Sequence, residues 1–281
     1  MSTKAIRKLV AASILALTAS ASQAAVVNDW NFTLDMKWDT TPGQTVFTTG
    51  LSGTRPGAGL TGVAPTEISW GAAYGTFFNN DPDKARSGLR ILQPHVTGNI
   101  GTSFEGQPVT TVDANMFTHY NSEISGTFKT LKQASMDVTV QLKLPGTNDT
   151  VANLNKKFDV HFYETPNVGG QCAWGPCAND VFAVISGIDL TSAFTYAGVQ
   201  YTLNYFEGTN QINPLSNATC TTMGFSGGSC YGFTTREGMK TDVKFNFSVT
   251  AVPEPETYAM LLAGLGMVGV MVRRRRNAIH N

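Results

Sequence analysis

Histidine is the side chain best suited to acid–base chemistry near neutral pH, and the central part of the chain holds three, His95, His119 and His161. A hydrolytic triad needs a histidine beside a nucleophile, with a carboxylate behind it. A metal hydrolase of the His-Glu-x-x-His type needs two histidines one helical turn apart, and the chain has no such pair. The sequence therefore predicts no catalytic residue, no metal site and no cofactor, and we expect the protein not to be an enzyme.

His119 has the most suggestive surroundings of the three, because Met116–Ile124 mixes polar and aromatic residues. Two interpretations stay open. Thr118 and Asn121 can satisfy backbone groups at a strand-to-loop corner, which makes His119 structural. Alternatively, His119 binds a ligand or is the centre of a hydrolase. That role requires an acidic residue and a hydroxyl or metal within hydrogen-bond reach of its ring, in a concave site.

The other two histidines have simpler interpretations. His161 alternates with the apolar residues of 158–162 along a predicted strand, so we expect it to face solvent on the opposite side of the sheet. His95 follows Pro94 near the end of a predicted strand, and we expect it to be structural.

Four cysteines lie in the central part of the chain and allow three disulfide pairings. We predict the local pairing, Cys172 with Cys177 and Cys220 with Cys230, because each pair brackets loop sequence that contains glycine or proline. Zinc binding is the alternative. It is disfavoured because the spacings are not the two-residue gaps of zinc knuckles, and because a chain that leaves the cytoplasm, as the N-terminus analysed below predicts, meets an oxidising compartment.

Two further segments could bind ligands. Trp174 lies inside the loop between the first two cysteines, where it is hard to bury, so it is the best candidate for stacking on a sugar ring. Trp30, Trp38 and Trp70 are more typical of a core. The oxygen-rich segment Asn79–Asp83 could bind Ca²⁺, but it lacks the spacing of an EF-hand loop, and we interpret it as a turn.

The elements that must position these residues are strands. Hydrophobic residues alternate with polar ones at period two, and turn sequences separate the alternating segments. We predict an all-β fold, an antiparallel β-sandwich or jelly roll of roughly ten strands, with no body helix of ten residues or more. The predicted strands include Asn28–Trp38, Thr66–Trp70, Leu89–Val96, Ser125–Leu131, Asp137–Leu144, Phe158–Phe162, Val181–Ile185, Tyr201–Tyr205 and Val243–Val249.

Composition limits the functional classes. Only 14% of the 281 residues are charged, which argues against a disordered acidic chain, a coiled coil or a basic nucleic-acid binder. Of 20 basic and 20 acidic residues, the terminal segments hold seven and two, which leaves 13 and 18 in the body, residues 25–251. This mildly acidic body has no electrostatic footprint for nucleic acid. It is expected to be one domain, although the glycine-rich stretch 50–62 could mark a boundary.

The N-terminus has the three-part arrangement of a secretory signal peptide, residues 1–24. Three basic residues precede the apolar run Leu9–Leu17, and small residues precede a cut after Ala24, which leaves Ala25 at the new N-terminus. A cut after Ala21 or Ala25 is also compatible with the sequence. Signal peptidase is therefore an expected partner.

The C-terminus has the features of a short membrane stop. Residues 257–272 carry no charge. As a helix they would span about 24 Å, against a hydrocarbon core of about 30 Å. The following Arg273, Arg274, Arg275 and Arg276 oppose translocation, so we expect a transmembrane helix with the arginines in the cytoplasm and the body outside. The glycines at 264, 266 and 269 could instead form a helix-packing face.

Val252-Pro253-Glu254-Pro255, an apolar stretch and an arginine cluster, in this order over residues 252–281, resemble the PEP-CTERM sorting signal. The resemblance implies a Gram-negative bacterium and recognition by an exosortase-type membrane enzyme. It also implies removal of the tail, with transfer to the cell surface or release into an exopolysaccharide matrix. Pro253, Glu254 and Pro255 are then a substrate motif held extended by the two prolines. An uncut membrane anchor is the alternative.

Thr118-His119-Tyr120-Asn121 matches the Thr-His-x-Asn motif (THxN) that names a family of PEP-CTERM proteins. The segments Ile68–Gly71 and Ser87–Leu89 are also similar to that family's pattern. This resemblance implies no activity. We therefore expect an exported protein, membrane-anchored only transiently, with a structural or adhesive role at the cell surface or in an extracellular polysaccharide matrix. The alternatives are a carbohydrate-binding module and a hydrolase centred on His119.

Overall fold

The computed structural model describes residues 26–51, 63–104, 106–165, 167, 169–185, 190–227, 229–252 and 264–269. These residues are mostly β-strand, which confirms the all-β part of the predicted fold class. The predicted signal peptide with Ala24 and Ala25, the motif Pro253–Pro255 and the cluster Arg273–Arg276 lie outside them.

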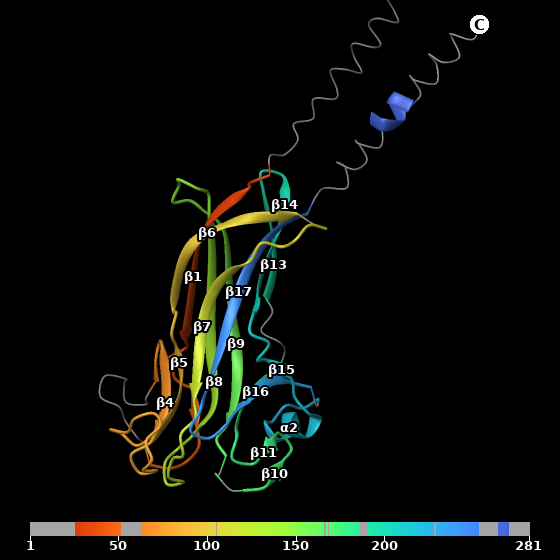
Figure 1. Cartoon of the computed structure of the whole chain (residues 1–281). Coiled ribbons are helices and arrows are strands. Elements are labelled where there is room, and N and C mark those ends of the chain that lie inside the picture. Colours follow the sequence, from red (N-terminus) through yellow and green to blue (C-terminus); the bar gives the residue numbers. More distant parts are fainter. Residues whose placement is uncertain are drawn as a thin grey trace, which may run out of the picture.

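The strands form two groups, which we call the β1 layer and the β17 layer (Figure 1). The β1 layer has the order β15-β16-β12-β9-β8-β1-β6, with β2 beside β8. Its members are β15 (Asn213–Pro214), β16 (Tyr231–Thr235), β12 (Asp180–Val184), β9 (Thr150–Tyr163), β8 (Leu131–Lys143), β1 (Asp29–Trp38), β6 (His95–Phe104) and β2 (Val46–Phe47).

The β17 layer has the order β13-β14-β17-β7-β5-β4-β3. Its members are β13 (Leu190–Tyr196), β14 (Val199–Glu207), β17 (Lys240–Val252), β7 (Val112–Tyr120), β5 (Arg86–Ile91), β4 (Glu67–Gly71) and β3 (Val63–Ala64). The last residues of β6 leave β1 and pair in parallel with β17, so β6 joins the layers. The sheet is therefore mixed and not purely antiparallel as predicted, and it has more strands than the roughly ten expected.

The core lies between the layers and is rich in aromatic residues. In β1, Trp30, Phe32 and Leu34 are buried while the residues between them are partly exposed, because successive side chains of a strand point to opposite faces. Trp30 meets Tyr201 of β14 edge-on at 5.1 Å, and Phe32 meets Phe247 of β17 at 5.4 Å. Each pair joins the two layers directly.

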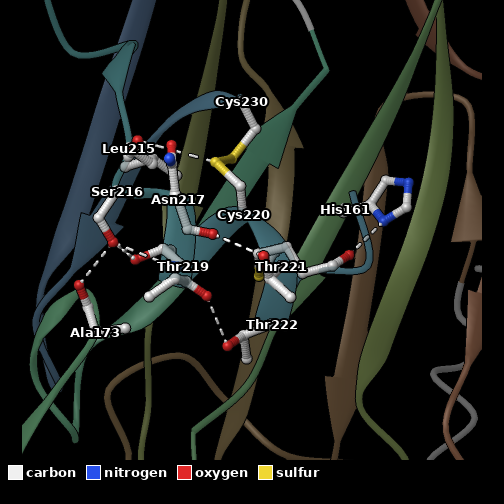
Figure 2. Close-up of a disulfide and its surroundings, with 12 residues drawn as sticks. His161, Ala173, Leu215, Ser216, Asn217, Thr219, Cys220, Thr221, Thr222 and Cys230 are labelled. Carbon is white, nitrogen blue, oxygen red and sulfur yellow. Dashed lines mark hydrogen bonds between the residues drawn. A yellow bond between two sulfur atoms is a disulfide. The ribbon is translucent and has the colours of Figure 1, made fainter. Parts of the chain in front are cut away.

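A small second core covers the outer face of β12. The helix α2 (Asn217–Thr222) begins at Ser216, whose Oγ accepts a hydrogen bond from the Thr219 backbone N–H (Figure 2). The disulfide Cys220–Cys230 packs there against Val181 and Ala183. Every residue of β12 is therefore buried, one face by the main core and the other by this second core.

The cysteines have the local pairing that we predicted. Cys172 is joined to Cys177 and Cys220 to Cys230, and no described cysteine is free. The first disulfide closes the small hairpin of β10 (Gln171–Cys172) and β11 (Gly175–Pro176). With both pairs oxidised, no thiol remains in the body to bind zinc.

Several predicted strands are confirmed and two are wrong. The strands predicted at Asn28–Trp38, Thr66–Trp70 and Val181–Ile185 match β1, β4 and β12 within one residue at each end. The predicted strand Leu89–Val96 is instead two strands, because β5 ends at Ile91 and β6 begins at His95 after Pro94. The predicted strand Ser125–Leu131 is mostly loop and turn.

No helix among the described residues is long and apolar enough to cross a membrane. Residues 264–269 are helical and belong to the predicted transmembrane stretch 257–272, whose other residues lie outside the described part of the chain.

The two disulfides should differ in their contribution to stability. Replacing Cys220 and Cys230 by serine should lower the free energy of unfolding by about 2–5 kcal/mol, because it removes a crosslink and buries two hydroxyls in the second core. Replacing Cys172 and Cys177 should cost less, since Cys172 is only partly buried. Urea unfolding of both variants measures the difference, and an equal or larger loss in the Cys172/Cys177 variant would contradict it.

Candidate functional site

His119 lies in β7 and is fully buried between the two layers. Its ring stacks on Trp70 of β4 at 6.3 Å and meets the edge of Phe162 of β9 at 4.9 Å. Its Nε2 is 3.8 Å from Oδ2 of Asp180, which is beyond hydrogen-bond distance. Neither ring nitrogen has a hydrogen-bond partner among the described residues.

Burial lowers the pKa of His119 to about 3, because the apolar surroundings disfavour the charged ring. The ring is therefore neutral at neutral pH and has no contact with solvent. The conditions for a hydrolase centred on His119 were an acid within hydrogen-bond reach and a concave, accessible site. This geometry meets neither condition.

Two carboxyl groups lie beside His119. Asp180 is fully buried, and its Oδ1 accepts a hydrogen bond from the Thr165 backbone N–H at 3.0 Å. Oε2 of the partly buried Glu164 accepts a hydrogen bond from the Trp70 indole N–H at 2.6 Å. The second oxygen of each carboxyl group, Oδ2 of Asp180 and Oε1 of Glu164, receives no N–H or O–H from other described side chains.

These two acids interact through their carboxyl groups. Burial raises the pKa of Glu164 to about 8 and raises the pKa of Asp180 well above its ordinary value; the neighbouring acid also raises the Asp180 value. Two carboxylates this close in an apolar site cannot both ionise easily, so the pair retains a proton at neutral pH. A protonated carboxyl group can donate a hydrogen bond to its neighbour, which gives both unpartnered oxygens a role.

Glu237, in the turn between β16 and β17, belongs to the same electrostatic cluster. Burial, and to a lesser extent the charge of Glu123, raises its pKa to about 7. A pocket of about 550 Å³ opens beside Glu164 and is also lined by Glu123, Thr165 and Asn167. Despite these oxygens, the described residues contain no group of three or more histidine, cysteine or acidic side chains placed to hold a metal ion.

Thr118 and Asn121 make the contacts expected of structural residues. Thr118 Oγ1 donates to Oδ1 of Asp242 on β17 at 2.6 Å. The side-chain amide of Asn121 donates to the Thr235 carbonyl at 2.9 Å, and its backbone N–H donates to the Met239 carbonyl at 3.0 Å. The Thr-His-x-Asn segment therefore joins the end of β7 to the β16–β17 turn. This arrangement favours the structural interpretation of His119.

The three segments that resemble the Thr-His-x-Asn family lie together. Ile68 on β4 pairs with Leu89 on β5, and Leu89 pairs with His119 on β7. Ser87 Oγ donates to the Ser122 carbonyl at 3.0 Å. A Cβ atom at Gly88 would lie 2.9 Å from the Ile68 carbonyl oxygen, so only glycine fits there. These close contacts explain why the three segments could form one structural unit.

The prediction for His161 holds only in part, and nothing tests the structural role predicted for His95. His161 lies on the face that we predicted, but it is only partly exposed. Its Nδ1 is 2.9 Å from the Met223 carbonyl oxygen (Figure 2), and Phe225 covers the ring with centroids 4.4 Å apart. The second core covers this position, and the alternation of residues along a strand does not predict such a covering segment. His95 begins β6 and pairs with Asp35 on β1 at 2.7 Å.

Trp174 is likewise only partly exposed. Its ring packs edge-on against Tyr163 at 5.4 Å and contacts the second core, and its indole N–H is buried without a partner. Trp30, Trp38 and Trp70 are buried in the main core. The tryptophans therefore form no exposed row on one sheet face that could stack on sugars.

Asn79–Asp83 is a turn, as we expected, and its oxygens are used internally. Asn79 Oδ1 accepts from the Asp81 backbone N–H at 3.0 Å, and Asp81 Oδ1 accepts from that of Asp83 at 3.1 Å. Asp81 also pairs with Lys84 at 2.7 Å.

One motif was missed from the sequence. Gly224-Phe225-Ser226-Gly227-Gly228 has the Gly-x-Ser-x-Gly spacing of a nucleophile elbow. That motif requires a strand before the serine and a helix after it. Here the helix α2 comes first and β16 follows, and the exposed Ser226 has no hydrogen bond to a histidine among the described contacts. The local order of elements therefore differs from that of a hydrolase.

Beyond the body, the last strand β17 ends at Val252, immediately before Pro253. Residues 251–276 match the family model of the PEP-CTERM protein-sorting motif. The chain carries a PEP-CTERM sorting signal. This signal indicates a protein that an exosortase-type enzyme sorts to the cell surface. The match does not extend to the Thr-His-x-Asn segment, and no curated protein matches the chain.

The buried cluster should give this PEP-CTERM protein a stability maximum at mildly acidic pH. The pKa of His119 is lowered from 6.5 to about 3 by folding, so the unfolded state binds more protons in that window and stability rises with pH. The pKa of Glu164 is raised from 4.5 to about 8, so the folded state binds more protons there and stability falls as pH rises. The two effects oppose each other between 4.5 and 6.5, and the raised pKa values of Asp180 and Glu237 add to the fall, so the maximum lies near the lower end of this window.

Two variants separate the effects in urea unfolding between pH 3 and pH 9. Glu164→Gln should flatten the fall between pH 6.5 and 8, and His119→Phe should flatten the rise below pH 4.5. Each group contributes a slope of up to about 1.4 kcal/mol per pH unit. A wild-type stability that keeps rising from pH 6.5 to 8 would show that the acid pair is ionised in the folded protein.

Proposed function

We propose that the protein is a structural or adhesive component of the cell surface or of an extracellular polysaccharide matrix, and that it is not an enzyme. In this proposal a signal peptide exports it, and an exosortase-type enzyme removes the tail that pauses in the membrane. The body is a β-sandwich of the β1 and β17 layers. The observation that carries the proposal is the sorting motif joined without a linker to the last strand of the body.

The burial and the hydrogen bonds of polar residues inside the body support a structural role. His119 and Asp180 are fully buried, and Thr118 and Asn121 are hydrogen-bonded between strands. The hydrogen bonds of Thr118 and Asn121 hold strands together, because buried polar groups need partners. An enzyme would instead need such groups to reach its substrate.

The outer face of the β1 layer is the surface best suited to a neutral polysaccharide. Thr33 on β1 lies between Thr97 on β6 and Gln141 on β8, and Gln141 lies beside Asn153 on β9. The row is four strands wide and uncharged, and it presents hydroxyl and amide groups that donate and accept hydrogen bonds. The mildly acidic body also favours neutral over strongly anionic sugars.

This row replaces Trp174 as the candidate contact for the alternative function, a carbohydrate-binding module. Adjacent rows are also polar, but they include charged residues. Asp35 lies between His95 and Thr139, and Thr139 Oγ1 donates to Asn155 Oδ1 at 2.9 Å. A long polymer could contact several rows at once, so individually weak contacts would add up to stable adhesion.

Processing is tested on the exported protein by mass spectrometry. The mature wild-type chain should begin near Ala25 and lack Arg273–Arg276, while Glu254→Ala should reduce tail removal at least about tenfold, because it changes the recognised motif. Glu256→Ala, two residues further on, is the matched control and should be processed normally. An intact arginine cluster on exported wild-type protein would favour the uncut anchor.

Adhesion is tested by co-sedimentation with purified exopolysaccharide from a producing strain. Thr33→Val with Thr97→Val keeps shape and strand propensity but removes two hydroxyls, and it should weaken binding roughly tenfold, at about 0.5–1.5 kcal/mol per hydrogen bond. Thr191→Val with Thr195→Val on the exposed face of β13 is the control. Equal binding by both variants would exclude this row as the contact.

A further inference from the structure

The first described residues of the chain lie against the end of the body where β14 begins. The Val27 backbone N–H donates to the Tyr201 hydroxyl at 2.8 Å. The Thr102 backbone N–H on β6 donates to the Asn28 carbonyl at 2.7 Å. The start of the body is therefore held in place by β14 and β6.

The last described residues of the body lie at the same place. Ala251 of β17 pairs with Tyr201 on one side and with Phe104 of β6 on the other, and Val252 pairs with Gln200. Tyr201 thus contacts both the beginning and the end of the body. Both ends of the body leave from one end of the sandwich (Figure 1).

Chain length limits how far this end can lie from a membrane that holds the tail. Four residues separate Val252 from Thr257, the first residue of the uncharged stretch, and the five steps between the two Cα atoms span at most about 18 Å when extended. The headgroup region on each side of a bilayer is about 5–8 Å thick. The end of the body can therefore stand no more than roughly 10 Å above the headgroups while the tail is inserted.

The part of this end next to the tail suits such contact, whereas Asp29 at the start of β1 and Asp149 in the β8–β9 turn place charge elsewhere on the same end. In the hairpin formed by β13 and β14, residues 190–206 carry no charge and Glu207 lies at the far end from the turn, and residues 245–252 of β17 carry no charge either. The turn of the β13–β14 hairpin is Ala197-Gly198. The nearby Phe104 is 40% exposed. Val109, in the loop between β6 and β7, is 53% exposed. The one charge in the sequence of that loop is Glu105, outside the described residues.

We propose that this part of the end, formed by the β13–β14 turn, residues 106–111 before β7 and the last residues of β17, rests on the headgroup layer of the bilayer until the tail is cut. The inference depends on the proposed function, because it requires the tail to be in the membrane. An uncharged surface with a few exposed apolar residues loses little hydration at a zwitterionic headgroup layer. The sorting enzyme would then find its motif between the body and the membrane.

The test uses the full chain reconstituted into phosphatidylcholine vesicles that contain a headgroup-spin-labelled lipid. An environment-sensitive fluorescent amino acid replaces Val109 in one variant and Met239 in another. Met239 is 55% exposed and precedes β17, so it lies at the opposite end of that strand, roughly 43 Å away. We expect several-fold stronger quenching at position 109 than at position 239.

Flotation of the vesicles distinguishes the two levels of failure. If the chain floats with the vesicles but both positions are quenched equally weakly, the resting contact is wrong while the tail's insertion stands. If the chain does not float, the insertion fails and this inference fails with it. Far-UV circular dichroism and the two disulfides, checked in both variants, show that the labelled bodies are folded.

Discussion

The structure depends on the pairing of one strand, β17, on both of its edges. It pairs with β7 along one edge and with β14 along the other, and at its end it pairs with β6, which connects it to the β1 layer. Its inward residues Val243, Phe245 and Phe247 are fully buried. The sorting motif continues directly from this strand, so the segment that the enzyme reads is attached to the best-anchored part of the body. A cut beyond Val252 would leave every one of these pairs intact.

The polar cluster around His119 is energetically the least favourable part of this core, because burying polar groups without partners costs free energy. The cost is reduced in two ways. His119 stays neutral, and Glu164 and Asp180 share a proton, so the cluster need not bury a full set of charges. The hydrogen bond from Trp70 to Glu164 spans β4 and the end of β9, so it also orients one layer against the other. Such a cluster favours one strand register over alternatives in which its members would be separated.

The sequence predicts features that depend on neighbours along the chain and misses those that depend on distant contacts. The alternation in β1 identifies both the strand and its buried face, and sequence separations of five and ten residues suffice for local disulfides. By contrast, β7 is buried on both faces, so it shows no alternation and was not predicted. Asp180 lies 61 residues from His119, and no sequence pattern brings them together. The covering of His161 depends in the same way on the second core.

The order of the strands also explains why a pause in the membrane suits this fold. The strand that completes the β17 layer is the last of the body, and it must insert between β7 and β14, which are far apart in sequence. Such non-local pairing is slow, because the chain loses conformational entropy in closing the loop before the stabilising contacts form. In the proposed sorting pathway, the apolar stretch after Val252 stops in the bilayer and leaves β17 outside while the body closes around it. Cutting the tail after that point releases a body whose central strand is already paired, whereas an earlier cut would release an unpaired strand with an exposed apolar face, which is a hazard for aggregation.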